Sequence, residues 1–310
     1  MDCLILGGSR FARRRVLPAL VSLDGIDAVH LASRSATGVP TSGRRFHDYQ
    51  EALEATPPGL VYVSLTNDAH ARWAEAALAH GHHVVVDKPA FTDLLTAERL
   101  VALACARSLL LAEATTYGYH PVMTELRRVF AEHGSAPTHV SCAFTPPVPT
   151  DDFRHRKALG GGALLDLGPY AASLGRVIWG VAPTAISACA TRDGDVDSSF
   201  SVLARYGGGR VLAGHFGFDT EYCNWIHLLG PGLAVEATGI FSTPPEAATE
   251  ITVRHRDAIT VRTSPPAPAM RLFLTAVLAT IARGDHAPLA QTLLDDARVL
   301  DRLRHAAEGQ

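Results

Sequence analysis

The stretch HVVVDKP, residues 83–89, places four strand-forming residues directly before an acid, a lysine and a proline. Branched valine side chains favour a buried, pleated backbone, so residues 83–86 are predicted to form a central strand. The charged pair then lies at the carboxyl end of that strand, which is where open α/β sheets bind their ligands. Lys88 is therefore a candidate for chemistry, although a solvated lysine beside a turn proline is an equally simple interpretation.

The same alternation of strand and helix runs through the first third of the chain. Strand-like apolar runs occupy 3–6, 28–32, 60–65 and 109–114, and helical spacing of apolar residues occupies 13–23, 70–80 and 94–106. Strands and helices that alternate with this period form parallel βαβ units. Residues 1–115 are therefore predicted to be an α/β Rossmann domain with a parallel, doubly wound sheet.

A glycine turn joins the first strand to its helix. It consists of Gly7, Gly8, Ser9, Arg10, Phe11 and Ala12, a match to the pattern G-x-G-x-x-G/A with serine at the second glycine. In this context the backbone N–H groups at the helix start meet a pyrophosphate. The second strand ends about 20 residues later at Ser33 and Arg34, where an NAD enzyme carries an acid for the ribose hydroxyl. A hydroxyl and an arginine suit the 2′-phosphate of NADP(H) instead, and the alternative is a loop arginine in solvent.

After Thr115 the alternation stops, and residues 116–310 are predicted to form a second, α+β domain. Strand-like runs follow at 138–145, 185–191, 198–206, 210–218, 224–229, 233–237 and 249–261, and helices are expected at 122–133, 162–179, 270–283 and 289–307. Turn dipeptides such as Asp193-Gly194 favour a mostly antiparallel sheet. Helices 162–179 and 270–283 are expected to cover one face, and the last helix to pack back on the body. The other face is left open for a subunit partner.

A second chemical stretch lies at residues 151–170. Asp166 and Tyr170 are four residues apart and would share one face of a helix, provided that Pro169 lies in its first turn. Three basic residues precede the glycine run 160–162: Arg154, Arg156 and Lys157. They are candidates for binding a diphosphate, and a solvated loop is the alternative.

The composition favours a small-molecule partner. The 310 residues carry 28 basic and 31 acidic side chains, a net charge of −3, so no basic field attracts nucleic acid or a membrane surface. Five scattered cysteines contain no C-x-x-C pair and indicate neither a zinc site nor a redox dithiol, and no metal is expected. The chain shows no basic leader and no long apolar run, which predicts a cytoplasmic protein.

Several motifs together resemble the glucose-fructose oxidoreductase and inositol dehydrogenase (Gfo/Idh/MocA) family. They are Gly7-x-Ser9-x-x-Ala12, Ser33-Arg34, Thr66-Asn67-x-x-His70, Ala76-Ala77-Leu78-x-x-Gly81-x-His83-Val84 and Asp87-Lys88-Pro89. Members usually read Glu-Lys-Pro at the last motif. The resemblance implies that the cofactor lies along these motifs, with Lys88 near both nicotinamide and substrate. The implied cofactor-binding residues are Gly7, Gly8, Ser9, Arg10, Phe11, Ser33, Arg34, Thr66, Asn67, His70, Asp87, Lys88 and Pro89.

Many members carry histidine where this chain has Tyr170. The tyrosine resembles the branch with dihydrodiol dehydrogenases and, more closely, NADP-dependent sugar-nucleotide 3-ketoreductases. That implies NADPH-dependent reduction of a deoxysugar at C3, with Tyr170 as the acid and Lys88 as a cation that lowers its pKa. The lysine is an alternative proton donor, and Asp166 would hold a sugar hydroxyl or orient Lys88.

Other functions fit the same residues. An NADP-dependent sugar or dihydrodiol dehydrogenase would use them in the oxidising direction, because acid and base exchange roles on reversal. The family also includes a non-catalytic regulator, which the presence of both Lys88 and Tyr170 argues against, and an imine reductase is a weaker alternative. The resemblance further implies a homodimer or homotetramer formed through the second domain's sheet.

Overall fold

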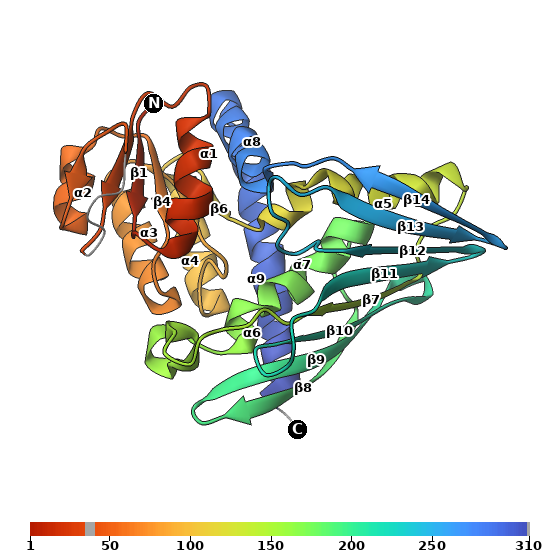
Figure 1. Ribbon diagram of the computed structural model, residues 1–310. Coiled ribbons are helices and arrows are strands. Elements are labelled where there is room, and N and C mark those ends of the chain that lie inside the picture. Colours follow the sequence, from red (N-terminus) through yellow and green to blue (C-terminus); the bar gives the residue numbers. More distant parts are fainter. Residues whose placement is uncertain (35–40, 309–310) are drawn as a thin grey trace. The chain divides into compact units, whose positions relative to one another are not determined.

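A computed structural model describes residues 1–34 and 41–308 (Figure 1). The chain divides into two compact units, which are described separately below. The first unit comprises Met1–Thr115 and Met270–Ala297, and the second comprises Thr116–Ala269 and Arg298–Gln310.

The first unit contains a six-stranded sheet whose strand pairs are all parallel. The strand order is β3-β2-β1-β4-β5-β6. The strands are β1 (Cys3–Leu6), β2 (Val29–Ala32), β3 (Arg45–Phe46), β4 (Leu60–Val63), β5 (His83–Val86) and β6 (Leu111–Glu113). The order reverses between β1 and β4, and such a switch point is where parallel sheets bind ligands. The predicted parallel, doubly wound sheet is confirmed.

Helices connect these strands. They are a π-helical turn at Ala12–Val16, α1 (Leu17–Val21), α2 (Tyr49–Ala55), the 3₁₀ turn Asn67–Ala69, α3 (His70–Ala79) and α4 (Leu94–Ala106). Asp48 and Asp93 cap α2 and α4 by accepting the backbone N–H groups of Glu51 and Thr96. Strand β3 and helix α2 were not predicted, because two strand residues and seven helical residues are too short to show a clear period.

Helix α8 (Ala269–Arg283) corrects one expectation. It was expected to cover the second sheet, but Met270–Ala297 belongs to the first unit. In the following helix α9 (Ala287–Glu308), Leu293 is buried in the first unit's core. The spacing of apolar residues shows that a helix buries one face but does not show which sheet receives it, and this explains the error. From Arg298 onward, α9 belongs to the second unit.

The second unit contains an eight-stranded sheet in the order β14-β13-β12-β11-β7-β10-β9-β8. The strands are β7 (His139–Phe144), β8 (Ala185–Asp193), β9 (Val196–Tyr206), β10 (Arg210–Gly217), β11 (Asn224–Gly230), β12 (Leu233–Thr238), β13 (Thr249–His255) and β14 (Ala258–Ser264). Every pair is antiparallel except β7 with β10, which confirms the mostly antiparallel prediction. The expected single run 249–261 is a hairpin instead. Its turn holds Arg256 at φ 54° and lacks the usual glycine or asparagine, so the sequence did not mark it.

Helices α5 (Pro121–Glu132), α6 (Ala163–Asp166) and α7 (Gly168–Trp179) share one hydrophobic core with this sheet. Figure 1 shows α5 running beside β12–β14. Residues 162–179 were expected to form one helix, but the helix is broken at Leu167, where Pro169 requires a new first turn. Outward-facing Leu203 and Arg205 on β9 are exposed, while their neighbours Val202 and Ala204 are buried.

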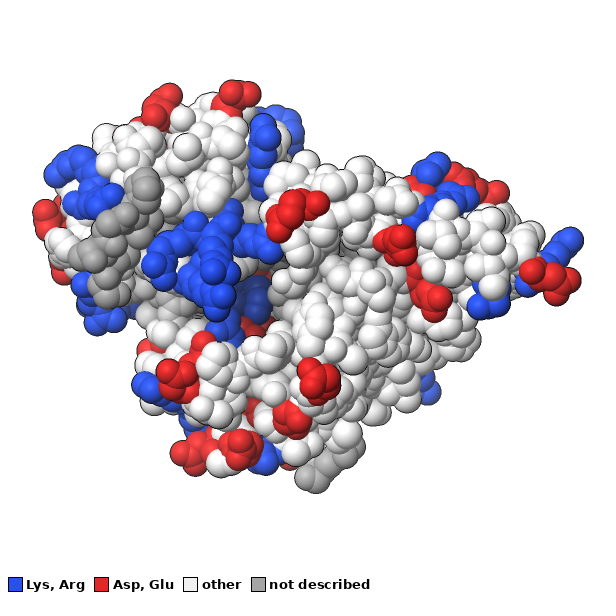
Figure 2. Space-filling view, viewed as in Figure 1, with Lys and Arg blue, Asp and Glu red and all other residues white. Residues whose placement is uncertain are grey.

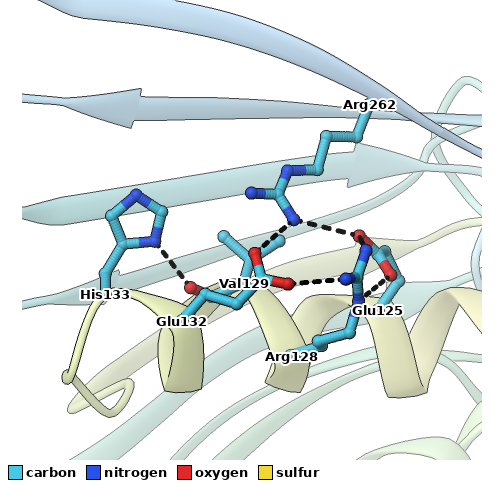
Figure 3. Close-up of polar contacts among 6 residues, drawn as sticks. All are labelled: Glu125, Arg128, Val129, Glu132, His133 and Arg262. Carbon is cyan, nitrogen blue, oxygen red and sulfur yellow. Dashed lines mark hydrogen bonds and ion pairs between the residues drawn. The ribbon is translucent and has the colours of Figure 1, made fainter.

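A set of ion pairs ties α5 to the edge strand β14 (Figure 3). Arg262 of β14 reaches Glu132 at 2.7 Å and Glu125 at 3.3 Å, and Arg128 contacts the same two glutamates from within the helix. The hydrogen bonds and charges of these arginines lower the pKa of Glu125. The network therefore fixes the helix over the end of the sheet. Among the described residues, no helix has both the length and the apolar character needed to cross a membrane.

Candidate active site

The glycine turn after β1 is shaped by one close backbone approach. Gly7 has φ +105°, and a Cβ there would collide with the Ser64 carbonyl. The Ser9 hydroxyl accepts the N–H of Ala12 at 2.9 Å and lies 2.9 Å from the Ser64 hydroxyl. Gly8, at the same turn, is half-buried. Serine at the second glycine position thus caps the first helical turn and contacts the end of β4.

Basic side chains follow this turn directly. Arg10, Phe11, Arg13 and Arg14 are exposed, and the helical turn that begins at Ala12 contains no acidic residue. Figure 2 shows lysine and arginine side chains gathered near α1. An exposed group of guanidinium charges at a helix start attracts anions but opposes the helix dipole.

The end of β2 contains the two residues predicted to select the cofactor. Ser33 is buried, and its N–H donates to the Phe46 carbonyl at 2.9 Å, which joins β2 to β3. Arg34 follows and is exposed. Of the described residues that follow β2 directly, Ser33 and Arg34, the second presents a guanidinium and neither is an acid.

His70, after β4, is held inside the unit. It has no exposed surface, and its ring nitrogens lie 2.9 Å from the Pro89 carbonyl and 3.1 Å from the Leu65 carbonyl. Burial lowers its pKa below the usual value. Thr66 is half-buried and Asn67 is buried beside it. His70 therefore joins the loop after β4 to the loop after β5 through their backbone carbonyls.

Asp87, at the end of β5, accepts two hydroxyl hydrogen bonds. Ser64 donates to its Oδ2 at 2.5 Å, and Tyr62, which is fully buried, donates to its Oδ1. Burial raises the pKa of Asp87, against the opposing effects of these hydroxyls, His70 and the neighbouring Lys88. Lys88 is half-buried and is joined to Pro89 by a cis peptide bond.

Glu113, at the end of β6, was missed by the sequence analysis. Its Oε2 accepts the N–H of Ala90 at 2.7 Å, and its Oε1 accepts the Thr115 hydroxyl at 2.7 Å. The residue thereby fixes the backbone that follows Pro89. Its position at the carboxyl end of a parallel strand, next to the strand that carries Lys88, was the available signal.

In the second unit, Arg154 bridges two carboxylates. Its Nε lies 3.0 Å from Asp166 Oδ1, and its Nη1 lies 3.1 Å from Asp152 Oδ1. Burial alone would lower the pKa of Arg154, but the charges and hydrogen bonds of Asp166 and Asp152 have the larger effect, and its pKa is raised. Arg156 and Lys157 are exposed. Of the three basic residues predicted to meet a diphosphate, Arg154 is therefore already paired.

The glycine run folds back on this loop. Gly162 has φ +113°, and its N–H donates to the Arg154 carbonyl at 2.8 Å. Asp197 on β9 accepts the N–H of Leu164 and so caps α6 from another strand. Burial raises the pKa of Asp197 above the usual range for a carboxyl. Asp197 was also missed, because a cap supplied from a distant strand leaves no local sequence pattern.

Tyr170 lies in the first turn of α7, with Pro169 beside it. Its half-buried ring is surrounded by three aromatic rings at centroid distances of 5.6, 5.1 and 5.4 Å, those of Tyr117, Phe144 and Phe241. Asp166 is the last residue of α6, so the two residues lie on successive helices and not on one helix, as their spacing had predicted. The ring cage restricts the tyrosine to few rotamers, which suits a residue that must present its hydroxyl in one direction.

The structure brings the predicted residues together in two sets. In the first unit, hydrogen bonds through Ser64 link the glycine turn to Asp87, and His70 contacts the carbonyl of Pro89, two residues after Asp87. In the second unit, Asp166 is paired with Arg154, while Arg156 and Lys157 are exposed. In the described ranges, no group of three or more histidine, cysteine or acidic residues is arranged to hold a metal ion.

A parallel sheet with a glycine turn, followed by an α+β unit with a large antiparallel sheet, defines the class of Rossmann-type oxidoreductases with a separate second domain. The chain belongs to the GFO/IDH/MocA family. Residues 1–115 match the model described as "Oxidoreductase family, NAD-binding Rossmann fold", and residues 133–236 match the "GFO/IDH/MocA C-terminal domain". The predicted family is confirmed.

Three known proteins show the range of relatives. A dTDP-3,4-didehydro-2,6-dideoxy-alpha-D-glucose 3-reductase from Saccharopolyspora spinosa is 31% identical over 90% of this chain and 87% of its own length. A D-xylose 1-dehydrogenase (NADP(+)) from Haloferax volcanii is 27% identical over 91% of this chain and 89% of its own. The crystal structure of a 3-ketoreductase from Actinomadura kijaniata with NADP and TDP-benzene is 26% identical, with a TM-score of 0.91 over 99% of this chain and 98% of that one.

Proposed function

We propose that this protein is an NADPH-dependent reductase of a nucleotide-linked deoxysugar, acting on a keto group at C3. The observation that carries the proposal is the similarity to 3-reductases over nearly the whole chain, in both sequence and fold. Residues 1–115 serve as the NADP-binding domain, and Met270–Ala297 belongs to the same compact unit. The rest of the predicted range 116–310 serves as the domain for substrate binding and oligomerisation.

The cofactor proposal rests on the ends of β1 and β2. Gly7 allows the turn to approach β4 closely, and the following backbone N–H groups are suited to the pyrophosphate. Arg34 is exposed where an NAD-specific enzyme would carry a carboxylate, and its guanidinium matches a 2′-phosphate. Arg10 adds positive charge beside the turn.

The chemistry uses Lys88 and Tyr170 on the same carbonyl group. When bound, NADPH supplies a hydride to the ketone carbon. Tyr170 donates its phenolic proton to the oxygen on which negative charge develops, and the product is an alcohol. The Lys88 ammonium stabilises the phenolate that remains and the developing charge on oxygen. The aromatic cage holds the tyrosine ring in place during this transfer.

The substrate would be held by the loop before α6. Asp166 is fixed by Arg154, and its carboxylate is the proposed acceptor for a sugar hydroxyl. Arg156 and Lys157 are exposed and positively charged, so they are the proposed partners of the diphosphate. Binding energy from the nucleotide would help to position the ketone, so a substrate without it should lose turnover as well as affinity.

An oxidising sugar dehydrogenase is the second candidate, favoured by the similarity to D-xylose 1-dehydrogenase (NADP(+)). The same residues would act with Tyr170 as base. A cytoplasmic location and a homodimer or homotetramer formed through the exposed face of the second sheet remain predictions. Exposed Leu203 and Leu229 on that face give an oligomer apolar surface to bury.

The test compares substrates. The nucleotide-linked 3-keto deoxysugar and the free keto sugar are offered with NADPH, and D-xylose and an aromatic dihydrodiol are offered with NADP⁺. We expect the highest kcat/KM for the nucleotide-linked ketone. A higher value for the free sugar would reject the nucleotide requirement, and a higher value for either alcohol would favour the dehydrogenase.

A further inference from the structure

A chain of hydrogen bonds runs from the glycine turn to the end of β5. The N–H of Ala12 donates to the Ser9 hydroxyl at 2.9 Å, the Ser9 and Ser64 hydroxyls are 2.9 Å apart, and Ser64 donates to Asp87 Oδ2 at 2.5 Å. Three segments that are distant in sequence, after β1, β4 and β5, are thereby connected. Lys88 follows Asp87 directly.

The direction of every bond in this chain is determined. A serine hydroxyl has one proton, and Ser64 gives its proton to Asp87. Ser64 must therefore accept the proton of Ser9, which in turn accepts from Ala12. Hydrogen bonds aligned in this way polarise one another, and the carboxylate at the end strengthens them all. Ser9 then has no hydroxyl proton left for a phosphate, so the turn meets an anion through its backbone N–H groups.

The carboxylate itself is held from two sides. Its second oxygen accepts from Tyr62, a fully buried residue of β4, so both oxygens have a hydroxyl partner. The aspartate stands where the family usually carries glutamate, and its shorter side chain keeps the carboxylate at the strand end beside Ser64. The bond from Ser64 is the one that connects the glycine turn to the backbone of residues 87 and 88, while the bond from Tyr62 comes from within the sheet.

We propose that Asp87 is a positioning residue which, through Ser64 and Ser9, locks the glycine turn to the strand end that carries Lys88. Cofactor binding at the turn and the placement of the lysine then depend on each other, and such coupling is reciprocal. The inference rests on the proposed function in one respect, since it takes the turn as the cofactor site.

The test measures NADPH dissociation constants by fluorescence titration and kcat at saturating NADPH and keto substrate. Ser9→Ala and Ser64→Ala should each weaken NADPH binding about three- to tenfold, because each breaks a chain that ends on a charge. The double variant should bind NADPH no more weakly than the weaker-binding single variant, since both substitutions break the same connection. Ser9→Ala should also lower kcat several-fold at saturation. If Asp87→Ala folds, it should behave like Ser64→Ala, because no side-chain acceptor for the serine proton remains at position 87; the serine variants decide the matter if it does not.

Two control variants distinguish a positioning role in cofactor binding from a general loss of stability on removal of a hydroxyl group. Tyr62→Phe removes the other hydroxyl from Asp87 but leaves the connection to Ser9, so NADPH affinity should stay within about twofold. Ser22→Ala removes a hydroxyl that bonds only to the Ala19 carbonyl among the described partners, and neither constant should change.

Equal weakening by Tyr62→Phe and Ser64→Ala would overturn the proposal, as would additive effects in the double variant. So would variants that melt at lower temperature but keep the wild-type NADPH affinity, which is the result expected of a merely structural bond. A wild-type protein that binds NADPH tightly but reduces no nucleotide-linked ketone would overturn the proposed function instead, and the binding measurements would still decide the coupling.

Discussion

Replacing Arg154 by methionine should lower the free energy of unfolding of the second unit by about 2 to 3 kcal/mol. Asp166, whose side chain is 7% exposed, lies 3.0 Å from the guanidinium and would be left without this cation. Removing one partner of a buried ion pair costs about 3 to 5 kcal/mol. Because the Arg154 side chain is 30% exposed, water entering its place screens the carboxylate, and the expected loss falls below that range.

Urea unfolding followed by intrinsic fluorescence measures this loss. Arg156→Met is the matched control in the same loop, since Arg156 is exposed and its Nη2 lies 3.4 Å from the Asp151 carbonyl. Arg156→Met should lower the free energy of unfolding by less than about 0.5 kcal/mol. Adding Asp166→Asn to Arg154→Met should recover part of the loss, because the buried negative charge that had faced Arg154 is then gone. Equal losses for Arg154→Met and Arg156→Met would refute the reasoning.

Three further predictions follow from the same geometry. Arg34→Ala should weaken NADPH binding about tenfold and leave NADH nearly unchanged in fluorescence titrations, and equal wild-type affinities for the two cofactors would contradict the NADP assignment. Tyr170→Phe and Lys88→Ala should each lower kcat about 10²-fold or more, with the double variant little worse, whereas near-normal turnover of Tyr170→Phe would show that another group is the acid. Stability should fall on acidification, because burial lowers the pKa of His83 to about 4 and also lowers that of His70. At these two histidines the folded state binds fewer protons than the unfolded state below about pH 6.5, so they lower the melting temperature between pH 7 and pH 5. The drop should therefore be smaller in His83→Gln than in the wild type, and an equal or larger drop in the variant would contradict the sign.

The sequence predicted the parallel sheet well, because its strands are nearly continuous apolar runs that end in recognisable turns. Strands β1 and β4 are fully buried along their length, and burial on both faces produces such runs. The antiparallel sheet was recovered from strand-like runs joined by turn dipeptides, but the hairpin between β13 and β14 was not, since its turn at Arg256 lacks glycine.

The candidate site was predicted only in part, because long-range contacts have no local signature. Lys88 and Arg34 could be identified from their positions at strand ends. The ion pair of Arg154 with Asp166, the cap that Asp197 gives to α6 and the support that Glu113 gives to Ala90 join residues 12 to 33 positions apart. A spacing of four suggested that Asp166 and Tyr170 lie on one helix, but the helix break at Leu167 places them on two.

The most direct test of the proposed reaction follows the hydride itself. The wild-type protein is incubated with a nucleotide-linked 3-keto deoxysugar and NADPH that carries deuterium at the transferred position of C4 of the nicotinamide. Mass spectrometry and NMR then locate the label in the sugar. We predict one deuterium bonded to C3 of the product and one equivalent of NADP⁺ formed. A product without deuterium, or with deuterium at another carbon, would contradict the account.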